Sequence, residues 1–241
     1  MAMEPLLTVV VPSYNEGKVV AETVARVLSS NPSNVDEVCV HVILDGPDPL
    51  ALKSLLELQS RCIKITELTK NSGKGYCLRL GASASNSKYV AFLDADLDLD
   101  PVAIWLGLEI LEQAVDPDIG CVYGSKFHPN SELKYPFLRK IASKMFRFVV
   151  KMLFGLTVDD SQTGLKVFRN SDLKHIINLT RENHFMLDLE IMILLNRRGV
   201  KMIPVPVNLN YKFSSTIGLR AVYKLGVQTV GLFLRHFVKL K

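Results

Sequence analysis

Three aspartates follow an apolar segment at every second position. Asp94, Asp96 and Asp98 come directly after residues 89–93, YVAFL, a run typical of a buried strand. Carboxylates just beyond the carboxyl end of a strand lie where open α/β sheets bind ligands. Their charges would repel one another unless a divalent cation joined them, and hard cations prefer oxygen ligands. The position after a strand therefore favours a metal site over the alternative, a solvated acidic turn.

Two further segments contain groups suited to binding a nucleotide. Residues 12–16, PSYNE, end an apolar run and open a predicted helix, so their polar groups and backbone N–H could contact a ribose or phosphate. The alternative is an ordinary helix cap formed by Ser13 or Asn15. Residues 71–75, NSGKG, predict a flexible loop whose Lys74 can approach a phosphate. P-loop spacing and a GxGxxG after the first strand are both absent from the sequence, which disfavours kinases, ATPases and dinucleotide dehydrogenases.

Strand-like and helix-like segments alternate through the first half of the chain. We predict strands at residues 6–11, 37–44, 63–67, 88–93 and 119–124, with helices at 16–30 and from 48 to about 60. This alternation predicts βαβ units, hence an α/β protein with an open, mostly parallel sheet and helices on both faces. Later segments predict a helix at 137–154, a strand at 164–169, a helix at 185–198 and an extended segment at 200–211, whose two prolines favour an edge position.

The composition excludes several classes of protein. With 241 residues, 48% of them hydrophobic, the chain can bury a core without disulfides or a structural metal, and it is not disordered. The four cysteines match neither a zinc ribbon nor a CxxC pair, so we expect them to be reduced. No N-terminal leader and no run long enough to span a membrane is expected.

The positive charge is concentrated at the C-terminal end. The net charge is +5, yet residues 191–241 hold nine Lys/Arg and no carboxylate. A one-sided basic segment suits an anionic membrane surface or nucleic acid. In a helix over 219–241, Arg220, Lys224, Gln228, Arg235 and Lys239 would share one face, with Val222, Val230, Phe233 and Phe237 opposite. This pattern predicts an amphipathic helix at a membrane surface.

Six segments, taken together and in order, resemble glycosyltransferase family 2, the inverting enzymes of GT-A fold. Within that family they are most similar to the polyprenyl-phosphate sugar transferases, which include dolichyl-phosphate mannose and glucose synthases. The resemblance covers nearly the whole chain. The segments are residues 9–17 (VVVPSYNEG), 70–75 (KNSGKG), 92–101 (FLDADLDLDP), 123–127 (YGSKF), 159–169 (DDSQTGLKVFR) and 185–190 (FMLDLE). The resemblance implies a Rossmann-like GT-A sheet and a C-terminal amphipathic interfacial helix.

The resemblance also implies roles for the matching residues. Asp96 and Asp98 would face Mg²⁺ or Mn²⁺, and Asp96, Gln162 and Asp188 would be catalytic. Lys126, which stands where many dolichyl-phosphate enzymes have arginine, would bind the acceptor phosphate with Arg139 and Arg220. The donor nucleotide would be bound by Pro12, Tyr14, Glu16, Asp45, Lys74 and Asp94.

The predicted function is metal-dependent transfer of a hexose, mannose or glucose, from a nucleotide sugar to polyprenyl or dolichyl phosphate. A lipid phosphate is already ionised near neutral pH and needs no strong base. A glycan or protein hydroxyl as acceptor is the first alternative, and it would need a carboxylate base, for which Asp188 is the candidate. A silent nucleotide-sugar-binding subunit is disfavoured by the intact aspartates. A nucleic-acid-binding module is disfavoured because the cations alternate with apolar residues and no known nucleic-acid motif is present.

We expect a peripheral protein at the cytoplasmic face of a membrane. Residues 1–211 would form the catalytic domain, with a nucleotide-sugar half at 1–125 and an acceptor half at 126–211, and residues 212–241 would be the membrane-surface segment. Residues 133–157 add six cations and no acid. For the helix over 137–154, contact with anionic lipid and simple packing on the sheet are both left open. A membrane-spanning partner, or spanning helices outside this chain, is also left open.

Overall fold

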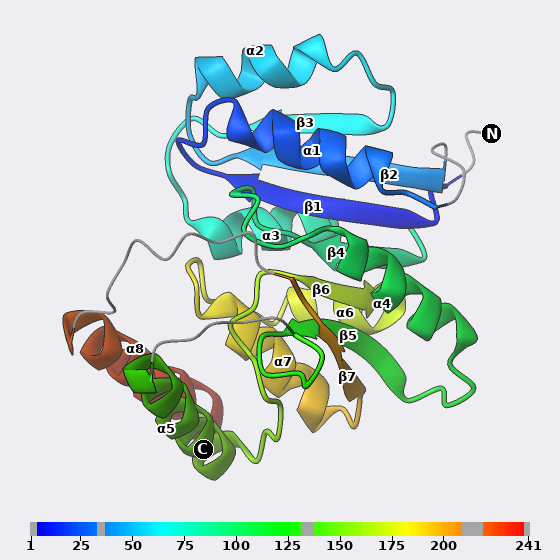
Figure 1. Cartoon of the computed structure of the whole chain (residues 1–241). Helices are drawn as coiled ribbons and strands as arrows, with labels where there is room; N and C mark the ends of the chain where they lie inside the picture. Colours follow the sequence, from blue (N-terminus) through cyan, green and yellow to red (C-terminus); the bar gives the residue numbers. More distant parts are fainter. Residues whose placement is uncertain (1–3, 33–36, 132–136, 209–218, 239–241) are drawn as a thin grey trace.

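A mostly parallel sheet forms the centre of the protein (Figure 1). The structure, a computed structural model, describes residues 4–32, 37–131, 137–208 and 219–238, without the side chains of 137–142, 219–225 and 237–238. Within this part of the chain seven strands are ordered β3-β2-β1-β4-β6-β5-β7. Only β6 runs antiparallel to its neighbours, β4 and β5. The strands are β1 (Leu7–Ser13), β2 (Val38–Leu44), β3 (Ile63–Glu67), β4 (Tyr89–Phe92), β5 (Ile119–Ser125), β6 (Lys166–Arg169) and β7 (Lys201–Pro206).

The sheet is buried on both faces, which explains the continuous apolar runs of its strands. In β1, Val9 and Val11 pack into one core layer and Val10 into the other, and all three are fully buried. Alternate residues of a strand point to opposite faces, so a strand covered on both sides must be apolar throughout. The predicted strand at residues 6–11 is confirmed as β1, and burial on both sides accounts for its β-branched run.

Helices cover each face of the sheet. Three helices contribute to the layer with Val9: α1 (Val19–Ser29), α2 (Pro49–Glu57) and α4 (Val102–Gln113). Three others contribute to the opposite layer: α3 (Lys74–Ser83), α6 (Asn170–Ile177) and α7 (Leu187–Arg197). The predicted α/β class with helices on both faces is confirmed.

Two further helices lie side by side at one edge of the molecule (Figure 1). They are α5 (Phe137–Phe154) and α8 (Leu219–Phe233), and α8 continues as the π-helical turn η2 (Leu234–Val238). Leu232 is buried in a small core with Val150 of α5 and Met192 of α7. The Phe154 and Phe233 rings meet edge to face, 5.9 Å apart. The pair is thus attached to the domain through α7.

The described side chains of α8 differ in their exposure. Val230, predicted to lie on the apolar side of the helix, is 50% exposed, whereas Thr229 and Leu232 are buried. Leu232 and Phe233 pack against α5, so α5 covers part of the apolar side of α8 while Val230 stays exposed. Val222 and Phe237 lie outside the side chains that the structure describes.

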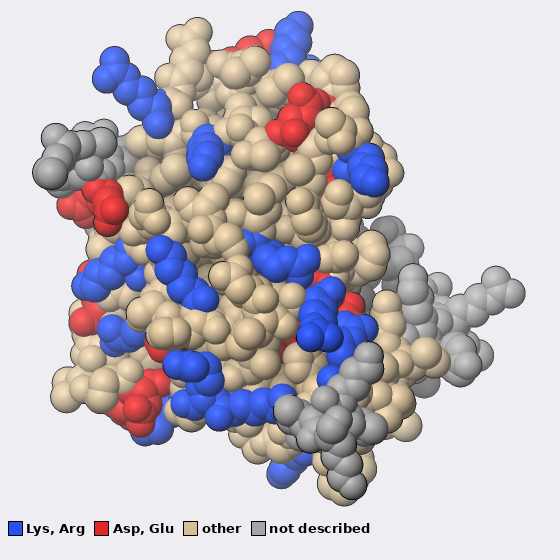
Figure 2. Space-filling model, turned by 180° about the vertical axis from the view of Figure 1, so that it is seen from behind, with Lys and Arg blue, Asp and Glu red and all other residues tan. Residues whose placement is uncertain are grey.

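Most predicted elements are confirmed within a few residues of their ends. The helix at 137–154 is α5, and the proline-containing segment is the edge strand β7. The four cysteines are free, two buried and two half-buried. Among the described helices, none is long and apolar enough to cross a bilayer. On the face shown in Figure 2, Lys and Arg side chains are dispersed over uncharged surface.

Candidate active site

The carboxyl edge of the parallel strands brings together predicted site residues from distant segments. Ser13 at the end of β1 is in register with Leu44 at the end of β2, and Val10 pairs with Phe92 at the end of β4. The segments that follow these strands therefore meet at one edge, as the fold class requires. They carry Glu16, Asp45, and Asp94 to Asp98, and the edge is completed by Lys126 after β5 and by residues 162–164 before β6.

Lys74, at the start of α3, pairs with the first aspartate. Its Nζ lies 2.6 Å from Asp94 Oδ1 and 3.7 Å from Asp188 Oδ2. Burial opposes the charge on each partner, but Lys74 lowers the pKa of Asp94 below its usual value, and the two aspartates raise the pKa of Lys74. Lys74 is therefore a fixed cation at the sheet edge.

Asp96, Asp98 and Glu16 form an acidic cluster beside this pair. Burial, followed by repulsion from Asp96 and Asp94, raises the pKa of Asp98 to about 6. The pKa of Asp96 is raised by burial and by Asp94, and that of Glu16 by burial, Asp96 and Asp94. Each carboxylate is therefore disfavoured by its neighbours, and a cation at this place would relieve the repulsion.

The local backbone holds these carboxylates in a strained turn. Asp96 Oδ1 accepts the Asp98 N–H at 3.1 Å, and Leu97 between them has a φ of 60°. A side chain other than glycine or asparagine seldom adopts this conformation, and such strain clusters at functional sites. The added Cβ of any residue at position 164 would lie 2.0 Å from Asp94 Oδ2, so a side chain there would displace the Asp94 carboxylate.

Asp96 and Asp98 fit a metal ion that is bound jointly by the protein and a substrate. Within the described residues no group of three His, Cys, Asp or Glu is arranged to hold an ion unaided. Mg²⁺ in nucleotide sites is commonly held by one or two carboxylates together with substrate phosphates and water. Asp96 and Asp98, with their raised pKa values, match that donor set, and their metal role stays a prediction.

Lys166 is a site residue that motif analysis missed. It lies in β6 with a fully buried side chain, and its Nζ contacts Asp188 Oδ1 at 2.6 Å and the Thr163 carbonyl. Together with the contacts of Lys74, this gives a chain of alternating positive and negative charges, Lys166–Asp188–Lys74–Asp94. A lysine among apolar residues in a strand of the central sheet was the available signal, because such a charge is buried only when it is paired.

Asp188 lies inside this chain of charges. It is buried at the start of α7, and each of its two oxygens faces one lysine. Both carboxylate oxygens are thus engaged by lysine ammonium groups. The arrangement therefore suits Asp188 to positioning Lys74 better than to accepting a proton from a hydroxyl, the role considered from sequence.

Asp45 holds the loop that contains Lys74. The carboxylate is buried, and its two oxygens accept the N–H groups of Ser72 at 2.6 Å and Gly73 at 2.9 Å. Gly73 has a φ of 99°, a region that favours glycine. The contacts of Asp45 are thus with its own chain, and its predicted contact with the donor base stays a prediction.

Residues 12–16 do not form the helix cap that was the alternative to a binding site. Lys18 occupies the cap position of α1 without a side-chain hydrogen bond, so the alternative cap by Ser13 or Asn15 is wrong. Pro12 and Ser13 are buried, and Tyr14 is exposed beside them. The Ser13 hydroxyl is buried and has no partner among the described residues. This orphan group is available to a ligand at the sheet edge.

The acceptor residues are described in part. The Lys126 N–H donates to Asp160 Oδ2 at 3.2 Å and the Gln162 N–H to Asp160 Oδ1 at 3.3 Å, so Asp160 joins the two segments. Gln162 Nε2 is buried without a partner in the described part of the chain. The side chains of Arg139 and Arg220 lie outside the described residues, and their roles stay predictions.

The sequence model of one protein family covers most of the segments that form this site. The model for glycosyl transferase family 2 matches residues 8–177, which include β1 to β6, Lys74, the aspartates and Lys126. The chain belongs to glycosyl transferase family 2. The predicted family, and with it the enzyme class, is therefore confirmed.

Similar proteins agree with this assignment. A dolichyl-phosphate beta-glucosyltransferase of Dictyostelium discoideum is 28% identical over 84% of this chain, which spans 65% of that protein's length. A UDP-N-acetylglucosamine–dolichyl-phosphate N-acetylglucosaminyltransferase of Methanococcus voltae is 22% identical over 96% of this chain and 99% of its own length. Glucosyl-3-phosphoglycerate synthase of Mycobacterium tuberculosis, solved with Mn²⁺, UDP and glucosyl-3-phosphoglycerate, has a TM-score of 0.70 at 15% identity, covering 96% of this chain and 79% of its own. The last likeness supports the GT-A fold.

Proposed function

We propose that this family 2 enzyme transfers a hexose, mannose or glucose, from a nucleotide-diphosphate sugar to a polyprenyl phosphate. The observation that carries the proposal is the meeting of the aspartates Asp94, Asp96 and Asp98 with Lys74 and Lys126 at one sheet edge. Charges of both signs at one edge suit a reaction between two phosphate-bearing substrates, one of which departs as a diphosphate.

In the proposed reaction, an acceptor phosphate oxygen attacks the anomeric carbon. The bond from that carbon to the donor diphosphate breaks, and the nucleoside diphosphate leaves with the electron pair. When bound between Asp96, Asp98 and the donor, Mg²⁺ or Mn²⁺ would supply positive charge to the diphosphate. Lys74 would be a second, permanent source of positive charge, because its pKa is raised. No strong base is needed, which agrees with the pairing of Asp188.

A polyprenyl phosphate acceptor is supported by the names of similar proteins. The relatives from Dictyostelium and Methanococcus carry different sugars in their names but share dolichyl phosphate. An open groove of about 290 Å³ beside α5 gives further support, since its lining includes Lys144, Arg147 and Lys151 with a single acid, Asp159. Arg147 Nε is buried there without a hydrogen-bond partner in the described part of the chain. These cations suit an anionic headgroup.

Action at a membrane surface is supported by exposed apolar residues on the helix pair. On α5, Met145 and Phe148 are each 65% exposed and Met152 is 70% exposed, and their spacing places them on one face. On α8, Val227 and Val230 are about half exposed as well. Exposed Lys144 and Lys151 lie beside the apolar residues of α5. Such a mixture suits the boundary between lipid headgroups and acyl chains, and the cytoplasmic face stays part of the proposal. The division into a catalytic domain at 1–211 and a surface segment at 212–241 also remains a proposal.

The direct test is a transfer assay with labelled donors. The protein is incubated with Mn²⁺, dolichyl phosphate and labelled GDP-mannose or UDP-glucose, and label in the lipid extract is measured. We expect label from one donor, and a loss of about 100-fold or more in Asp96→Asn, the size of effect seen when one charge-stabilising group is removed. Asp118→Asn, which changes an exposed carboxylate beside β5, is the matched control and should keep full activity.

Two outcomes would count against the proposal. Absence of lipid-extractable label with every common donor would show that polyprenyl phosphate is not the acceptor. Full activity of Asp96→Asn would show that Asp96 does not bind a catalytic metal ion. A parallel reaction with oligosaccharide or peptide acceptors in place of the lipid tests for a hydroxyl-directed transferase. Such an enzyme would transfer the label to the added oligosaccharide or peptide.

A further inference from the structure

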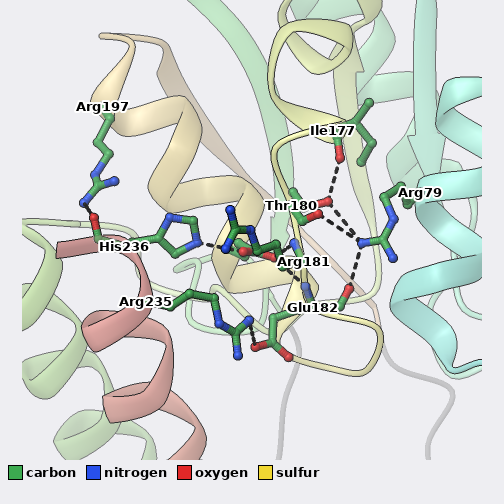
Figure 3. Close-up of polar contacts among 9 residues, drawn as sticks. Arg79, Ile177, Thr180, Arg181, Glu182, Arg197, Arg235 and His236 are labelled. Carbon is green, nitrogen blue, oxygen red and sulfur yellow. Dashed lines mark hydrogen bonds and ion pairs between the residues drawn. The ribbon is translucent and has the colours of Figure 1, made fainter. Parts of the chain in front are cut away.

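The loop between α6 and α7, residues 180–186, is held in place by α3. Arg79 of α3 donates through Nη1 to the Thr180 carbonyl at 3.4 Å and to the Glu182 carbonyl at 3.2 Å (Figure 3). It also donates through Nη2 to Asn183 Oδ1. A side chain that reaches several carbonyl and amide oxygens fixes the backbone of a loop that has no regular structure of its own. The 180–186 loop is thus a defined part of the domain.

The same loop packs directly on the segment that carries Lys74. The Tyr76 N–H donates to the Asn183 carbonyl at 3.2 Å. An added Cβ at Gly73 would lie 2.2 Å from the Asn183 carbonyl oxygen, and one at Gly75 would lie 2.8 Å from the loop backbone. The Phe185 ring lies 5.7 Å from Lys74 Nζ. Any shift of the loop would therefore be transmitted to the fixed cation of the donor site.

The C-terminal turn η2 holds this loop from the other side. Glu190, fully buried in α7, accepts the N–H groups of Arg181 and Glu182 through Oε2, each at 2.9 Å. Its Oε1 lies 2.7 Å from His236 Nε2. Arg235 Nη1 pairs with Glu182 Oε1 at 2.6 Å (Figure 3). The contacts of η2 are thus to both the loop and its buried anchor.

We propose that Arg235 and His236 are positioning residues of the donor site. By holding the 180–186 loop against residues 73–76, they fix Lys74 where the donor diphosphate binds, although neither side chain reaches the sheet edge itself. Arg197 supports the arrangement by donating to the His236 carbonyl at 3.3 Å. The inference rests on the proposed function, because it needs a donor whose diphosphate meets Lys74.

The test compares donor binding in the wild type and in Arg235→Ala/His236→Ala of the full chain. Binding of UDP and GDP with Mn²⁺ is measured by calorimetry, and donor and acceptor KM are measured separately. We expect the nucleotide dissociation constant and the donor KM to rise at least tenfold, with the acceptor KM within twofold. Arg235→Lys/His236→Gln, which keeps a cation and a hydrogen-bonding side chain, should recover most of the affinity. Arg198→Ala, an exposed cation at the end of α7, is the matched control and should bind as the wild type does.

The outcomes separate this inference from the proposed function. If the wild type binds neither nucleotide, the proposed function is wrong. If the wild type binds and the folded double variant binds within twofold of it, the positioning role is wrong. If the alanine variant does not fold, Glu182→Gln, which weakens only the pair with Arg235, replaces it, and an unchanged affinity in that variant would overturn the role of Arg235.

Discussion

Replacing Lys166 by methionine should destabilise the protein strongly. The Lys166 side chain is fully buried, and its Nζ lies 2.6 Å from Asp188 Oδ1. Methionine keeps much of the volume but removes the charge, so Asp188 is left buried with only Lys74, at 3.7 Å. Removing one partner of a buried ion pair costs about 3–5 kcal/mol, because the remaining charge is not compensated. For a domain of this size the loss corresponds to a fall in Tm of roughly 6–20 °C.

The measurement is denaturant unfolding of the wild type, Lys166→Met, Asp188→Leu and the double variant. A lower midpoint with an unchanged m-value reports the free energy of unfolding. The double variant should lose less than the sum of the single variants, since removing both charges leaves no unpaired ion. Lys174→Met, at an exposed position of α6, is the control and should change stability by about 0.5 kcal/mol or less. A loss below about 1 kcal/mol in Lys166→Met, or strict additivity in the double variant, would refute the reasoning.

Three further predictions concern the site and the helix pair. Because the pKa of Asp98 is raised to about 6, its contribution to stability is present below about pH 4 and lost as pH rises through 6. Asp98→Asn should therefore raise the denaturant midpoint of unfolding at pH 7 and flatten the dependence of that midpoint on pH. An unchanged pH profile would contradict this. Gly164→Ala should lower activity at least tenfold, since its Cβ would lie 2.0 Å from Asp94 Oδ2; activity within twofold of the wild type would show that the loop yields. Phe148→Asp should weaken flotation with anionic vesicles about tenfold or more, whereas Leu56→Asp, at a similarly exposed position of α2, should not. Equal flotation of the two variants would show that α5 does not contact the membrane.

Much of the fold follows from local patterns in the sequence. The β-branched run at 6–11 predicted a strand, and the two prolines at 204 and 206 predicted an edge strand. These signals are local, because burial on two faces and a missing backbone donor are properties of one segment. The antiparallel insertion of β6 between β4 and β5 was not predicted, since strand order depends on contacts between segments far apart in the chain.

The candidate site was predictable in position but not in its connections. Asp94 and Asp96 follow a recognisable strand, so the sheet edge at which they lie could be identified from sequence. The burial of Lys166 and the contact of Glu190 with His236 could not, because each pairs residues 22 or more positions apart. The contacts of Asp45 with the Lys74 loop could not be predicted for the same reason, since its oxygens accept N–H groups 27 and 28 positions away.

What the amino-acid sequence determined by itself was the α/β class, the family and the sheet edge at which the aspartates lie, because strand periodicity and motif order are encoded along the chain. What the tertiary structure alone decided was which charges are neutralised and by which partner. Lys74 is held between Asp94 and Asp188, and Asp188 in turn by Lys166. Hydrophobic periodicity specifies which side of an element is buried, but the partner of a buried charge is set by packing between distant elements.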